Sequence, residues 1–206
     1  MDDLTEFQHA AITEMLNIAI GKSAAALNAL VDEEVTLSVP EVIFTTCGEA
    51  ARMIEKQAGS VACAVMQEFV GAFSGNAMLI FPEAKSLALV RLMIGEAVPL
   101  ESLTELEQEA LTEVGNIVLN ASLGTLANLL GLEIDSSLPV YLSGTGSAIL
   151  QDAVGKCADS DWALLVEVDF ELKKSNIDGY VLLMLDVASA QRFGDLVDAY
   201  VKNFMS

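Results

Sequence analysis

Two short stretches of the sequence place a carboxylate and an amide three residues apart. Glu14 precedes Asn17 in Thr-Glu-Met-Leu-Asn-Ile, and Glu113 precedes Asn116 in Thr-Glu-Val-Gly-Asn-Ile. On a helix, residues three apart are neighbours on the surface. An amide is a poor nucleophile and a poor general base, but it donates and accepts hydrogen bonds at once, so it can hold a water molecule in line with a phosphorus atom. A carboxylate beside it could pair with a partner's lysine and fix the amide in place.

The two stretches belong to a longer internal repeat. Ser23, Leu27, Leu30 and Pro40 return 99 positions later as the same residue types, the displacement that also relates the two Glu and Asn pairs. No linker rich in Pro, Gly or Ser separates the halves near residues 96–105. The sequence therefore predicts a single domain, residues 1–206, made of two repeats at about 1–99 and 100–206.

Each half predicts the same order of elements: a long amphipathic helix, an extended stretch around a proline, a short helix, two apolar strands and a closing helix. The expected ranges are 3–31, 34–46, 48–57, 60–69, 74–82 and 83–95, then 103–131, 132–143, 147–156, 161–172, 178–186 and 187–203. Gly75 and Gly179 begin equivalent strands displaced by 104, which predicts about five extra residues in a loop at 173–177. The order predicts an α/β (α+β) fold with pseudo-twofold symmetry, a central, mainly antiparallel sheet, two long outward-facing helices and shorter helices.

The long helices are amphipathic, and each begins at residues spaced as a capping box, Asp3 with Glu6 and Ser102 with Glu105. Plotted at 100° per residue, one side of each helix collects apolar residues expected to pack on the sheet. These residues are Leu4, Phe7, Ala11, Ile12, Met15, Ile18 and Ala19, then Leu103, Leu106, Ala110, Val114, Ile117 and Val118. The opposite sides carry the expected site residues: Ala10, Thr13, Glu14, Asn17 and Gly21, then Glu109, Thr112, Glu113, Asn116 and Asn120.

A single Glu and Asn pair on a solvated helix face is ordinary. The repeat changes this interpretation, because Asn in mid-helix costs a few tenths of a kcal/mol relative to better helix formers, and both helices keep it at the same place. In the first copy, the neighbours Ala10, Gly21, Ala24 and Ala25 are small, so another protein could approach closely. We interpret the two faces as partner-binding sites.

The composition excludes several classes of function. The formal charge is −20, from 30 acidic and 10 basic residues, so nucleic acid would be repelled. The acidic surface suits solubility, and it could also steer the chain toward a basic patch on another protein. Three widely separated cysteines, Cys47, Cys63 and Cys157, argue against a disulfide framework and against a zinc site. No apolar run is long enough to span a membrane, and the acidic N-terminus is unlike a secretory signal, so we expect a cytoplasmic protein.

Other catalytic motifs are weak. His9 is the one histidine, which leaves no partner set for a serine or cysteine triad or for a multi-histidine metal site. Gly144-Thr145-Gly146 resembles the start of a dinucleotide loop, but position 149 is isoleucine where the last glycine belongs, so we interpret it as a turn.

With two Glu-x-x-Asn motifs in equivalent helices of a duplicated chain, the sequence resembles the CheC family of chemotaxis phosphatases, within the CheC/CheX/FliY group, over nearly its whole length. The resemblance implies dephosphorylation of a CheY-type response regulator at its phosphoaspartate. Asn17 and Asn116 would orient the attacking water, and Glu14 and Glu113 would pair with the regulator's active-site lysine. No cofactor is expected on this chain, because the Mg²⁺ belongs to the regulator. The resemblance also implies a CheD-type receptor deamidase as a partner, which we place near the short helix at 147–156.

The sequence departs from the family pattern at several positions. The family often has Asp or Ser four residues before the glutamate, where this chain has Ala10 and Glu109. Gly21 in the first copy corresponds to Asn120 in the second, and Leu16 corresponds to Gly115. These differences leave the relative activity of the two sites open. The alternative hypothesis is a non-catalytic adaptor or flagellar-switch-like module that binds a response regulator or a CheD-type deamidase.

Overall fold

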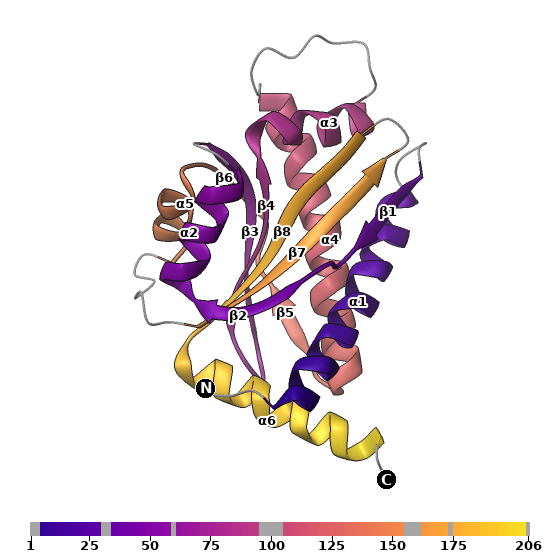
Figure 1. The fold of residues 1–206 in the computed structure, drawn as a ribbon. Helices are drawn as coiled ribbons and strands as arrows, with labels where there is room; N and C mark the ends of the chain where they lie inside the picture. The colour runs from indigo at the N-terminus through magenta and orange to yellow at the C-terminus, as the bar shows by residue number, and fades with distance from the viewer. Residues whose placement is uncertain are drawn as a thin grey trace.

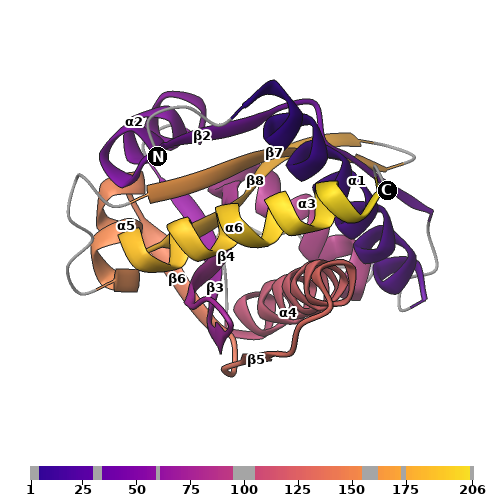
Figure 2. The same ribbon diagram turned by 90° about the horizontal axis from the view of Figure 1, so that it is seen from below.

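The computed structural model describes residues 5–29, 34–58, 61–94, 105–154, 162–172 and 175–204. The long helices are α1 (Glu6–Asn28) and α4 (Glu105–Leu130), which lie side by side on one face of a central sheet (Figure 1). The helix α6 (Val187–Phe204) runs across the lower end of this face, as Figure 2 shows, and α3 (Glu83–Ile94) lies at the other end. The short helices α2 (Cys47–Ala58) and α5 (Gly146–Val154) lie together on the other face.

Among the described residues the sheet has eight strands, and every described pairing is antiparallel, as predicted. Its central strands run in the order β7, β8, β4, β3. They are β3 (Ala62–Gly71), β4 (Gly75–Pro82), β7 (Trp162–Leu172) and β8 (Ser175–Leu185). The outer strands are β1 (Val35–Ser38) and β2 (Val42–Thr46) at one edge, and β5 (Ile134–Ser136) and β6 (Val140–Gly144) at the other.

The two halves of the chain exchange strands within this sheet. The strands β1 and β2 of the first half pair with β7, whereas β5 and β6 of the second half pair with β3. The boundary expected near residue 99 lies outside the described residues. A half cut out of the chain would leave β3 or β7 without its outer neighbours, so the topology favours a body that folds as one unit.

The pseudo-twofold axis passes through two contacts between equivalent residues. Met78 of β4 pairs with Leu182 of β8, and these residues are 104 positions apart. Between the long helices, the hydroxyl oxygens of Ser23 and Ser122, 99 positions apart, lie 2.9 Å from each other and are buried. The symmetry seen in the sequence is therefore also present in the packing of the two halves.

The extra residues of the second half lie at the tip of its hairpin. Phe69 pairs with Gly75 in the first half, and the equivalent pair in the second is Val168 with Gly179. Beyond that pair, β7 and β8 continue for four more pairs, from Asp169 with Asp178 to Leu172 with Ser175. The prediction of a loop at 173–177 is corrected, because residues 175–177 pair as strand; residues 173 and 174 lie outside the described chain.

Two apolar cores hold the layers together. Alternate residues of β3 supply both of them: Cys63, Val65 and Phe69 pack toward α1 and α4, whereas Ala64 and Met66 pack toward α2 and α5. On the second face, the Oε1 of Glu55 accepts hydrogen bonds from the hydroxyl (2.7 Å) and the backbone N–H (3.0 Å) of Ser147 at the start of α5. These bonds lower the pKa of Glu55 and join α2 to α5.

The first turns of the long helices differ from the prediction. Phe7 is 65% exposed and Leu106 is 60% exposed, although both were expected in the core. The buried stripes follow Ile12, Met15, Leu16 and Ala19 in α1 and their equivalents in α4, and they continue backwards toward Gln8 and Glu107. Gln8 donates a hydrogen bond to Asp198 of α6, and Glu107 is buried, so polar residues occupy the inward places that the apolar pattern gave to Phe7 and Leu106.

The start of α1 and the state of one cysteine also correct the sequence analysis. Thr5 caps α1 in a capping box with Gln8, in place of the expected Asp3 and Glu6; Asp3, Ser102, Leu4 and Leu103 lie outside the described residues. Cys47 is disulfide-bonded, a bond that the sequence analysis, which argued against a disulfide framework, did not predict; Cys63 is a free, buried thiol.

Within the described parts of the chain, we find no helix whose length and apolar character would let it cross a membrane.

Candidate functional site

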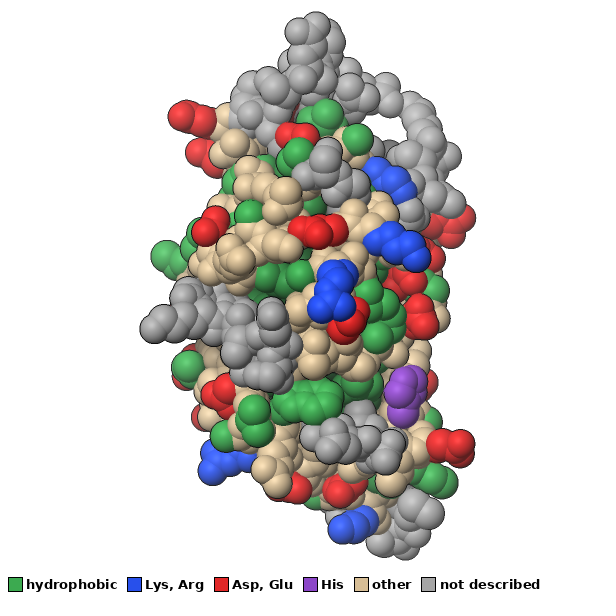
Figure 3. All heavy atoms as spheres, turned by 60° about the vertical axis from the view of Figure 1, so that its left-hand side comes forward, with side chains coloured by type: hydrophobic (Ala, Val, Ile, Leu, Met, Phe, Trp, Pro, Cys, Tyr) green, Lys and Arg blue, Asp and Glu red, His purple; other side chains and the backbone are tan. Residues whose placement is uncertain are grey.

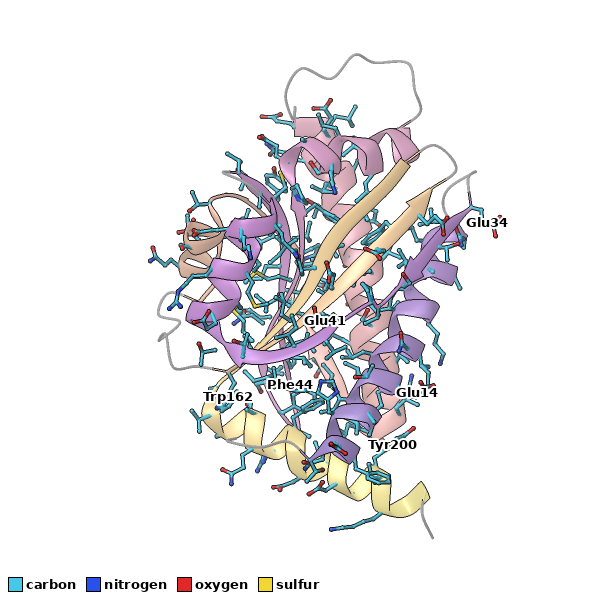
Figure 4. The ribbon with its side chains drawn as sticks, viewed as in Figure 1. Glu14, Glu34, Glu41, Phe44, Trp162 and Tyr200 are labelled. Carbon is cyan, nitrogen blue, oxygen red and sulfur yellow. The ribbon has the colours of Figure 1, made fainter. Side chains whose placement is uncertain are left out.

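The outer face of α1 carries the first predicted site. Glu14 and Asn17 are exposed, and Figure 4 shows Glu14 pointing away from the sheet. No hydrogen bond joins the Asn17 side chain to any described residue. Ala10 and Gly21 are exposed on the same helix, and a methyl group added at Gly21 would meet nothing within 4 Å. The face is therefore flat and open, with a free amide near its middle.

The outer face of α4 carries the second predicted site. Glu109, Glu113 and Asn120 are exposed, whereas Asn116 is partly buried. The Oδ1 of Asn116 accepts hydrogen bonds from the Nδ2 of Asn120 at 2.7 Å and from the Nε2 of Gln67 at 3.2 Å. The sequence placed the same motif on both helices, but the structure gives the two amides different surroundings.

The threonine before each glutamate is engaged by its own helix. The hydroxyl of Thr13 donates to the backbone oxygen of His9 at 2.9 Å, and that of Thr112 donates to the backbone oxygen of Gln108 at 2.6 Å. Both threonines are partly buried. They stand beside the predicted sites, but their protons are used within the helix, so they are poor donors to a partner.

Gln67 is a site residue that the sequence analysis missed. It lies on β3, is 1% exposed, and also donates to the backbone oxygen of Ser137 at 3.1 Å. Its Oε1 is buried and has no hydrogen-bond partner in the described part of the structure. The signal in the sequence was a lone amide inside the apolar run from Ala62 to Val70.

A close helix-to-strand contact brings Gln67 to the site. A Cβ placed on Gly115 would lie 2.4 Å from the Cβ of Val65, so α4 approaches β3 more closely than any side chain at position 115 would allow. Val65 and Gln67 point to the same side of β3, because strand side chains alternate. Gly115 thus lets the next residue, Asn116, reach Gln67.

An acidic cavity of about 380 Å³ adjoins the second site. Its lining residues are Glu105, Gln108, Glu109, Thr112, Glu113 and Tyr141. The hydroxyl of Tyr141 donates to the sulfur of Cys63 at 3.1 Å. Burial, followed by this hydrogen bond, raises the pKa of Tyr141 well above its ordinary value, so the phenol stays protonated and cannot act as a base.

His9 and Gly144 belong to motifs that the sequence analysis set aside, and both have structural surroundings. The ring of His9 packs edge-on against Phe44 at 5.7 Å, as an aromatic contact at the margin of α1. Gly144 has φ of 155° and stands just before α5, as part of the expected turn. Over the described ranges, no cluster of three or more His, Cys, Asp or Glu side chains could hold a metal ion.

The side of the molecule that carries α2 and α5 is mixed in charge. Figure 3 shows basic and acidic side chains interspersed with small apolar areas on this side. On α5, Ile149 and Leu150 are buried, while Gln151 and Asp152 are exposed. Neither of the Glu and Asn pairs belongs to this side.

The family model and the curated relative both point to chemotaxis and flagellar-switch phosphatases. The family model described as "Chemotaxis phosphatase CheX" matches residues 63–158. The flagellar motor switch phosphatase FliY of Bacillus subtilis (strain 168) is 26% identical over 210 residues, which cover 98% of this chain and 52% of that protein. The chain thus spans about half the length of that relative.

Solved structures show the same fold. The crystal structure of Thermotoga maritima FliY matches with a TM-score of 0.79 and 19% identity, covering 96% of this chain and 98% of that one. The CheX of Borrelia burgdorferi, solved in a complex with CheY, BeF₃ and Mg²⁺, matches with a TM-score of 0.50 and 16% identity, covering 82% of this chain and 96% of the matched chain.

Proposed function

We propose that this chain, which the comparisons place with the CheC/CheX/FliY chemotaxis phosphatases, accelerates hydrolysis of the aspartyl phosphate of a CheY-type response regulator. The observation that carries this proposal is the outward-facing pair of glutamate and asparagine on each of two equivalent helices. The complex of a CheX with CheY and Mg²⁺, a likeness in fold, supports a receiver domain as the partner.

The proposed chemistry needs only positioning from this chain. The oxygen of a water molecule attacks phosphorus, the bond between phosphorus and the aspartate oxygen breaks, and the products are a free carboxylate and inorganic phosphate. The amide of Asn17 or Asn116 enters the regulator's pocket and aligns the water, while Glu14 or Glu113 pairs with a lysine there. The Mg²⁺ that neutralises the phosphoryl charge is held by the regulator, and this chain contributes no cofactor.

The two faces suit such a partner in shape and chemistry. Phe7 and Leu106 are equivalent, exposed, and seven residues before the glutamates, so each stands two helical turns away on the same face. The proposed face therefore presents an apolar contact at one end and a carboxylate and an amide at the other. A receiver with a lysine beside its phosphorylation site and apolar residues nearby would match this arrangement.

The alternative hypothesis is a regulator-binding adaptor without catalysis. Ala10 and Glu109, which depart from the family pattern, favour it, as does the engaged amide of Asn116. A CheD-type deamidase remains an expected second partner, and the exposed part of α5 is the place we propose for it.

A turnover assay separates catalysis from binding. The organism's own CheY-type regulators are phosphorylated, freed of phosphodonor, and followed for phosphate loss with this chain at one tenth of their concentration. We expect loss from the target regulator to accelerate on the order of 100-fold, the scale that positioning of a reacting group contributes. Saturable binding without faster loss would support the adaptor; no preference for any phosphorylated regulator would exclude both hypotheses.

A further inference from the structure

The amide of Asn116 is already occupied within its own chain. A carbonyl oxygen has two lone pairs, and the Oδ1 of Asn116 accepts from both Asn120 (2.7 Å) and Gln67 (3.2 Å). An amide that aligns a water must accept from it as well as donate. Asn116 can do so only after it gives up one of its present partners.

The first site lacks both of these partners. The position equivalent to Asn120 is Gly21, which has no side chain, and the position equivalent to Gln67 is Val166, which cannot donate. The helix contact differs too, because buried Leu16 stands where α4 has Gly115. The two sites therefore differ because their equivalent residues differ, both in hydrogen-bonding partners and in helix packing.

Gln67 is a poor residue for a sheet core on packing grounds alone. It is 1% exposed, and its Oε1 is buried without a hydrogen-bond partner among the described residues, a state that lowers stability. Its Nε2 is directed at Asn116 and at the backbone of Ser137. The orientation of Gln67 thus places a hydrogen-bond donor beside the Asn116 amide of α4.

We propose that Gln67 is a positioning residue which, with Asn120, holds the Asn116 amide in a restrained state, so that Asn17 carries most of the activity of the chain. This inference rests on the proposed function. The second site acts when a partner displaces Asn120 or Gln67 from the amide oxygen, and it is the slower of the two for that reason.

Single and combined substitutions test the ranking in the turnover assay. We expect Asn17→Ala to slow the stimulated rate about tenfold or more, and Asn116→Ala to slow it less than about twofold. Adding Gln67→Val and Asn120→Ala to the Asn17→Ala variant removes both partners of the Asn116 amide, as in the first site. We expect this combined variant to dephosphorylate the regulator about tenfold faster than Asn17→Ala alone, which corresponds to about 1.4 kcal/mol. Asn128→Ala, which removes another exposed amide from α4, is the matched control.

Side-chain NMR tests the restraint without any regulator. The amide group of Asn116 should show a high order parameter and that of Asn17 a value below about 0.6, and Gln67→Val should lower the value for Asn116. Equal mobility of the two amides in the unsubstituted chain would overturn the proposal. So would equal losses from the two single substitutions, even where the unsubstituted chain is an active phosphatase. A chain that accelerates no regulator but shows the mobility difference would instead remove the proposed function and leave the restraint standing.

Discussion

Replacing Asn17 and Asn116 together with alanine is expected to slow regulator dephosphorylation by on the order of 100-fold, down to the regulator's own rate, because both water-aligning amides are gone. Binding of the phosphorylated regulator should be retained, since Glu14, Glu113 and the flanking apolar residues remain. Phosphate loss at several chain concentrations, together with titration calorimetry, separates the two effects.

The control for this double variant is stability. Alanine is the better helix former, so the substitutions should not lower the free energy of unfolding, and Asn128→Ala should leave the rate unchanged. If the double variant still turned over the regulator at the unsubstituted rate, the amides would have no part in the chemistry.

Replacing Gly115 with alanine is expected to destabilise the protein by about 1–3 kcal/mol, although the same change in an open helix stabilises. The added Cβ would lie 2.4 Å from the Cβ of Val65, a short, branched side chain held in β3 that cannot swing away. Because this contact also places Asn116 beside Gln67, the variant should loosen the second site. The midpoint of urea unfolding measures the loss.

Gly124 offers a matched control on the same helix. A methyl group there would meet nothing within 4 Å, so Gly124→Ala should stabilise by roughly 0.5–1 kcal/mol. A lower free energy of unfolding for Gly115→Ala and a higher one for Gly124→Ala would establish the close approach of α4 to β3. Stabilisation by both would mean that α4 stands farther from the strand than described.

The repeat made much of the fold predictable. A fixed displacement of 99 gave two equivalent long helices and a matching order of strands, and the structure contains all of these elements within a few residues of the expected ranges. The insertion at 173–177 was placed at the correct hairpin but predicted as a loop, because the sequence does not show whether the extra residues pair as strand. The pairing of β7 with β8 decides that residues 175–177 do.

The wrong predictions concern residues whose orientation depends on contacts with parts of the chain that are distant in sequence. Phe7 and Leu106 fit the apolar side of a helical wheel, yet Gln8 and Glu107 face inward instead, in the case of Gln8 to bond Asp198 of α6. Gln67 could be noticed as a polar residue in an apolar strand, but its partner is 49 residues away and is reached only through strand exchange and a glycine contact.

The most direct measurement is a structure of this chain bound to its CheY-type regulator, loaded with Mg²⁺ and beryllofluoride. We predict the regulator's phosphorylation pocket over the outer face of α1, with the Asn17 amide at about 3 Å from the water or fluorine that marks the attack position, and Glu14 paired with a regulator lysine. A regulator seated on the side of α2 and α5, with both asparagines in open solvent, would contradict this prediction.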